Sequence, residues 1–98
     1  MKIANCSPLL FAVALAFLPS AHAASQAQMA RDCDAEIERV EKRIVQARKK
    51  PEYRSKEGRQ ALSTADRWLH QARQHAAKGE PRHCLDAAKK GRAQVSGR

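Results

Sequence analysis

The stretch ARDCDAEIERVEKRIVQA, residues 30–47, decides the fold class of this chain. Its small and apolar residues recur at alternating spacings of three and four: Ala30, Cys33, Ile37, Val40, Ile44 and Ala47. An α-helix has about 3.6 residues per turn, so this spacing places them on one side of a helix. Charged residues fill most of the positions between them. The stretch therefore predicts a long amphipathic helix, which we expect over residues 26–50.

Local signals mark the expected ends of this helix. SQAQ, residues 25–28, has the S-x-x-Q form of a capping box, in which side chains satisfy the first free backbone N–H groups of a helix. Pro51 follows the last apolar position, and proline inside a helix removes a hydrogen bond and clashes with the preceding turn. We therefore expect the helix to begin near Ser25 and a turn to be centred near Glu52.

Two further helical segments follow. In the second, apolar residues again alternate at three and four, widened by two more: Leu62, Ala65, Leu69, Ala72 and Ala76, with Ala61 and Trp68. Gly79 suits the position after a helix end, and Pro81 suits the first turn of the next helix. The third segment carries on one side Cys84, Leu85, Ala88, Gly91 and Val95. These patterns predict helices over residues 55–78 and 81–96, and no alternating strand pattern is present.

Short turns between three helices favour an all-α, up-down-up bundle, here a long hairpin with a shorter third helix. Ahead of it, LLFAVALAFL, residues 9–18, is an unbroken apolar run after a short positive start. Ala21 and Ala23 then form an A-x-A cleavage site, so residues 1–23 are typical of a cleavable signal peptide. A membrane span needs about 20 apolar residues, and no segment after residue 23 approaches this. We predict cleavage after Ala23, with Ala27 as the alternative site, and one small helical domain over residues 24–98 in the periplasm or secreted medium.

The cysteines of this predicted domain are Cys33 and Cys84. Exported compartments are oxidising, so the pair predicts one disulfide. In an up-down-up bundle the two positions differ in level by about four residues, or about 6 Å, which packed helices can absorb. A chain with so few large apolar residues has a marginal core, and the bond would staple it. The alternative is a redox-active or metal-binding thiol pair, which the absence of a C-x-x-C motif disfavours.

The charge pattern carries the main functional signal. The chain has 19 lysines and arginines against 10 acids, a net charge of +9. Acids dominate the first half of the first predicted helix, and cations then gather at the expected hairpin tip: Arg48, Lys49, Lys50, Arg54, Lys56 and Arg59. Such a pole can meet anionic lipid, lipopolysaccharide, nucleic acid or an acidic protein. Tyr53 is the one aromatic residue among these cations, which gives base stacking on nucleic acid little support. The alternative is a solvated basic surface.

Motifs of enzymes are missing: the sequence has no G-x-S-x-G, no P-loop and no H-E-x-x-H. We therefore predict no catalytic residue and no cofactor. His75 and His83 are expected near one level beside Cys84, where zinc or copper is the alternative to ordinary surface histidines. No H-x₃-H pair supports a metal, so we predict no metal ligand.

Two function classes are consistent with these features. The first is an exported, non-catalytic binding module that uses the basic hairpin tip to contact an anionic envelope component or an acidic protein. The second is a small stress-related holding chaperone, which would need exposed apolar helix faces; a metal-binding protein is a third, weaker reading. The apolar stripes are narrow and are used by the bundle, which favours the binding module.

Overall fold

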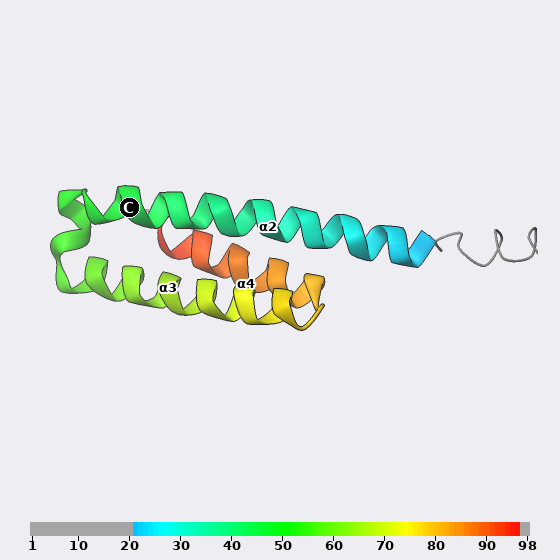
Figure 1. Cartoon of the computed structure of the whole chain (residues 1–98). Coiled ribbons are helices and arrows are strands. Elements are labelled where there is room, and N and C mark those ends of the chain that lie inside the picture. The colour runs from blue at the N-terminus through cyan, green and yellow to red at the C-terminus, as the bar shows by residue number, and fades with distance from the viewer. Residues whose placement is uncertain (1–20, 97–98) are drawn as a thin grey trace, which may run out of the picture.

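The computed structural model describes residues 21–96, and these residues are helical apart from short turns (Figure 1). Helix α2 spans Ala21–Arg48, the 3₁₀ turn η1 spans Pro51–Arg54, α3 spans Lys56–Ala77 and α4 spans Pro81–Gln94. Helices α2 and α3 form a long antiparallel hairpin, and α4 returns along it in contact with both. The predicted up-down-up bundle with a shorter third helix is confirmed.

Most helix ends lie within two residues of their predicted positions, and the start of the first helix is the exception. Helix α2 is already formed at Ala21, and Ser25 lies inside it, so SQAQ does not begin the helix. Alanine has the highest helix propensity, and nothing among AHAA, residues 21–24, interrupts the hydrogen-bond ladder. The apolar run of the predicted signal peptide lies outside the described residues, whereas residues 21–23 belong to α2.

The two turns follow the local chemistry of their residues. The Ser55 hydroxyl caps α3 by accepting from the Gly58 N–H at 3.0 Å. At the other end of α3, Gly79 adopts a φ of 73°, in the left-handed region that favours glycine. This conformation lets the Glu80 N–H donate to the His75 carbonyl at 2.9 Å. The predicted stop at Gly79 is therefore correct, and α4 begins at once with Pro81.

The core is a narrow column between the helices, in which alanines and cysteines outnumber the larger side chains. Its buried hydrophobic residues are Cys33, Ile37, Val40, Ile44, Ala47, Tyr53, Ala61, Ala65, Leu69, Ala72, Cys84, Ala87, Ala88 and Val95. Leu62, Trp68 and Leu85 are only partly buried against this column. Small residues allow the helices to approach closely: a Cβ built on Gly91 would lie 3.4 Å from the Ala65 carbonyl oxygen.

Two residues predicted on the apolar stripes, Ala30 and Ala76, are exposed. Ala30 lies one turn before Cys33, level with the turn that joins α3 to α4. Ala76 lies in the last turn of α3, at the same end of the bundle. The stripes are therefore covered only where all three helices overlap. None of the described helices has an apolar stretch long enough to cross a membrane.

Candidate functional site

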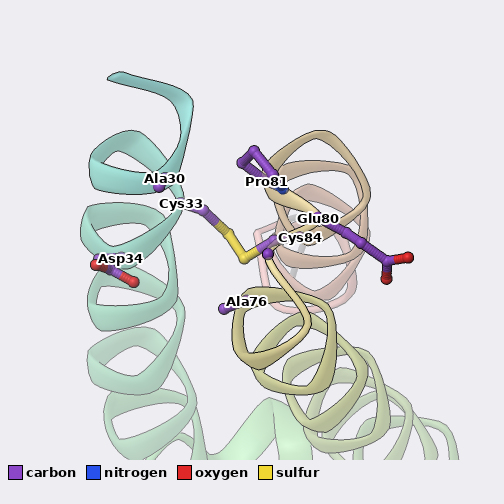
Figure 2. Close-up of a pocket in the computed structure, with 8 residues that line it drawn as sticks. Ala30, Cys33, Asp34, Ala76, Glu80, Pro81 and Cys84 are labelled. Atoms are coloured by element: carbon purple, nitrogen blue, oxygen red, sulfur yellow. A yellow bond between two sulfur atoms is a disulfide. The ribbon is translucent and has the colours of Figure 1, made fainter. Parts of the chain in front are cut away.

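One end of the bundle holds the cysteine pair (Figure 2). Cys33 of α2 and Cys84 of α4 are bonded as a disulfide, with their Cα atoms 6.0 Å apart. Both side chains are buried, at 1% and 0% exposure. They border a small hollow of about 120 Å³ whose other lining residues are Ala30, Asp34, Ala76, Gly79, Glu80 and Pro81. The pair thus has the geometry the sequence predicted, and it joins the two helices that are farthest apart in the chain.

A buried acid beside the disulfide was not predicted. Glu36 is only 5% exposed, although it belongs to the charged residues that lie between the apolar positions of this helix. The Arg92 Nη1 group of α4 donates to both carboxylate oxygens of Glu36 at 3.0 Å, and Arg39 Nη1 lies 3.4 Å from Oε1. Glu36 lies three residues after Cys33, next to Ile37, so its place at the edge of the apolar stripe was the available signal. This ion pair ties α2 to α4 and is structural.

The opposite end, the hairpin tip, carries the six predicted contact residues. Arg48 pairs with Asp66 of α3 at 2.9 Å, and the Arg59 Nη1 group donates to the Arg54 carbonyl at 2.9 Å. The remaining cations are exposed, and their side chains form no ion pair within the described part of the chain: Lys49, Lys50, Arg54 and Lys56. The fold therefore brings the predicted cations to one end, at the close of α2, in η1 and at the start of α3.

The tip is a compact turn. Tyr53 of η1 is 2% exposed, and its hydroxyl has no hydrogen-bond partner among residues 21–96. The backbone of η1 presses on the first turn of α3: a Cβ on Gly58 would lie 2.7 Å from the Glu52 carbonyl oxygen. The exposed cations of the tip therefore extend from a well-packed backbone.

Charge is distributed unevenly along the bundle. Between residues 42 and 67 there are nine cations, Lys42, Arg43, Arg48, Lys49, Lys50, Arg54, Lys56, Arg59 and Arg67, against three acids, Glu52, Glu57 and Asp66. Residues 21–41 and 68–96 together have eight cations and seven acids. The half of the bundle around the tip is therefore strongly positive, and the half around the disulfide is nearly balanced. A dipole of this kind orients a molecule toward an anionic surface.

His75 of α3 and His83 of α4 lie at the disulfide end of the bundle. The rings of His75 and His83 are 5.2 Å apart between centroids, as expected from the turn geometry. His75 Nδ1 is 2.8 Å from Glu80 Oε1, and this hydrogen bond, ahead of the nearby positive charges, lowers the pKa of Glu80 below 4.5. Within residues 21–96 no three His, Cys, Asp or Glu side chains are grouped as metal ligands.

No protein-family model, curated protein or solved structure is significantly similar to this chain. The functional inference therefore rests on the geometry and charge of its own residues.

Proposed function

We propose that this protein is an exported, non-catalytic binding module that attaches through its basic hairpin tip to an anionic component of the cell envelope. The observation that carries the proposal is the positive charge of residues 42–67, which contain nine cations and only three acids. Four of the tip cations are exposed and free of ion pairs within residues 21–96. Near an anionic membrane each such lysine or arginine can contribute about 1 kcal/mol of attraction.

Export is part of the proposal. The apolar run with its A-x-A site supports a cleaved signal peptide, and the Cys33–Cys84 pair is compatible with an oxidising compartment. The exported chain would begin at Ala24 and keep most of α2. Intact-mass measurement of exported protein tests this point, and a mature species that still begins at Met1 would contradict it.

The chaperone alternative requires exposed apolar surface to capture unfolded chains. Of the large hydrophobic residues that the structure describes, Val45 is the one that stands clearly exposed, at 49%. A single exposed valine is ordinary for a small protein. Salt separates the two functions, because charge-driven attachment weakens steeply as salt rises, whereas apolar capture does not.

The test is co-sedimentation with anionic and neutral vesicles over a salt series. The fourfold variant Lys49→Gln/Lys50→Gln/Arg54→Gln/Lys56→Gln should lose binding to anionic vesicles at low salt and keep its helical circular dichroism. All four positions are exposed, so the core is untouched. Lys50→Gln alone should weaken vesicle binding only about fivefold, because it removes about 1 kcal/mol of attraction and leaves the other three cations in place.

A matched variant controls for net charge. It changes four exposed cations of the disulfide half: Arg31, Lys78, Arg82 and Lys89. Lys90 is left in place because its Nζ lies 4.7 Å from the centroid of the Trp68 ring, a cation–π contact. We expect this variant to retain most of the vesicle binding. Equal losses in both variants would refute a localised site. A wild-type protein that does not bind anionic vesicles at low salt would refute the lipid contact; an acidic protein partner would then be the one form left to test, and a solvated basic surface would be the better interpretation.

A further inference from the structure

Helix α4 ends at Gln94, well before the hairpin tip (Figure 1). An open groove lies beside the end of this helix. The groove has a volume of about 280 Å³. It is lined by Lys42, Arg43 and Gln46 of α2, by Lys50 in the turn after α2, and by Val95 and Ser96 after α4. Its apolar floor consists of Ala47 and Val95, which are 3% and 8% exposed. No acid lines it among the described residues, so the charged side chains at the groove are all cations.

The guanidinium of Arg43 is held at this groove by a neutral group. Its Nη1 donates to the Ser96 hydroxyl oxygen at 2.9 Å, and that hydroxyl donates to the Arg92 carbonyl at 2.7 Å. The hydrogen bond orients the guanidinium but does not cancel its charge. An oriented planar guanidinium has further N–H donors and matches the oxygen spacing of a phosphate group.

Two lysines flank Arg43. Lys42 Nζ lies 3.3 Å from Glu38 Oε1, and both side chains are largely exposed, at 75% and 69%. Exposed i,i+4 pairs of this kind contribute only about 0.3–0.5 kcal/mol, so Lys42 can turn toward the groove at little cost. Lys50 makes no ion pair within residues 21–96. The helix dipole places about half a negative charge at the C-terminal end of α4, and the positive charges of Lys42, Arg43 and Lys50 outweigh it.

We propose that this groove binds a phosphate group, with Arg43 as the bidentate contact and Lys42 and Lys50 as flanking charges. This proposal adds to the proposed function the chemical group that is recognised. A membrane lipid as the source of the phosphate rests on that proposed function. The phosphate could belong to a lipid head group or to a soluble phosphate compound, and the experiment below separates these sources. Arg43 and Ser96 are 53 residues apart, so the folded end of α4 completes the site.

The test follows the backbone amides of ¹⁵N-labelled protein as inorganic phosphate is added, with chloride at equal ionic strength as the reference. We expect saturable shifts at Gln46, Val95 and Ser96 with phosphate. The variant Lys42→Gln/Arg43→Gln should weaken this response at least about tenfold, because it removes charge-assisted hydrogen bonds. Arg43→Lys keeps the charge but loses the planar fork, so it should weaken phosphate binding several-fold. A double variant that binds phosphate as the wild type does would overturn the proposal.

A variant of the hairpin tip shows whether a failed experiment counts against the groove or against the proposed function. Lys49→Gln/Arg54→Gln/Lys56→Gln leaves the groove intact and should keep the phosphate response. Shifts of equal size at every basic residue, or the same shifts with chloride, would overturn the groove. Phosphate shifts without vesicle binding would support the groove with a soluble ligand and refute the envelope contact. Stronger binding to phosphatidylglycerol vesicles than to carboxylate vesicles of equal charge would support a lipid phosphate as the source.

Discussion

Replacing Gly58 by alanine should destabilise the protein, although helix propensity alone predicts the opposite. Alanine is more favourable than glycine inside a helix by about 0.8–1 kcal/mol. In this fold, however, an alanine Cβ at position 58 would lie 2.7 Å from the Glu52 carbonyl oxygen and in closer conflict with the Tyr53 Cα. Both are backbone atoms, so η1 would have to shift, and Tyr53, which is 2% exposed, would shift with it.

The expected loss of stability in Gly58→Ala is the cost of overpacking minus the gain in helix propensity. Overpacking costs about 1–3 kcal/mol, and we take the upper end, about 3 kcal/mol, because neither backbone atom can rotate away. Subtracting the propensity gain of about 1 kcal/mol leaves a net loss of about 2 kcal/mol. For a domain of this size 1 kcal/mol corresponds to about 4–8 °C, so Gly58→Ala should lower the Tm by roughly 8–16 °C.

Gly91 provides the matched comparison in the middle of α4. A Cβ there would lie 3.4 Å from the Ala65 carbonyl oxygen and 3.5 Å from Val40 Cγ1, which are ordinary contact distances. Gly91→Ala should therefore gain about 0.5–1 kcal/mol from helix propensity. Thermal and urea unfolding of both variants, followed by circular dichroism, measure the two changes. A Gly58→Ala protein as stable as the wild type would refute the reasoning, since it would mean that η1 does not press on α3.

Other perturbations have expected outcomes of their own. Reducing the disulfide frees a loop of 51 residues in the unfolded chain and should cost about 4 kcal/mol. A Tm that falls by only a few degrees on reduction would contradict this. Arg92→Ala should cost about 2 kcal/mol because it leaves the buried Glu36 carboxylate only its longer contact with Arg39, and adding Glu36→Leu should restore most of that loss in urea unfolding. A loss that persists in the double variant would show that the charge is not its cause. The hydrogen bond from His75 lowers the pKa of Glu80, so the ionised carboxyl contributes stability that is present above its ordinary value of 4.5 and lost as pH falls through its folded value. Glu80→Gln should therefore flatten the decline of Tm below pH 4.5, and an unchanged decline would count against this contact.

Much of the fold is determined by the sequence itself. The three-four spacing from Cys33 to Ala47 predicts the part of α2 that is buried, because a helix face is a local consequence of its periodicity. Pro51 and Gly79 mark the turns through backbone geometry that depends on single residues. Short turns then make neighbouring helices antiparallel, so the approach of the cysteines and the gathering of the cations at the tip follow from topology.

Other features were decided only by the tertiary structure. The burial of Glu36 depends on Arg92, 56 residues away, and the orientation of Arg43 depends on Ser96, 53 residues away. Both contacts require the rotation and axial offset of α4 against α2, which side-chain periodicity within each helix does not define. The close fit of Gly58 against η1 likewise depends on how the turn packs. Periodicity selects which face of a helix is buried, whereas the atoms that meet across that face are set by how the helices settle against one another.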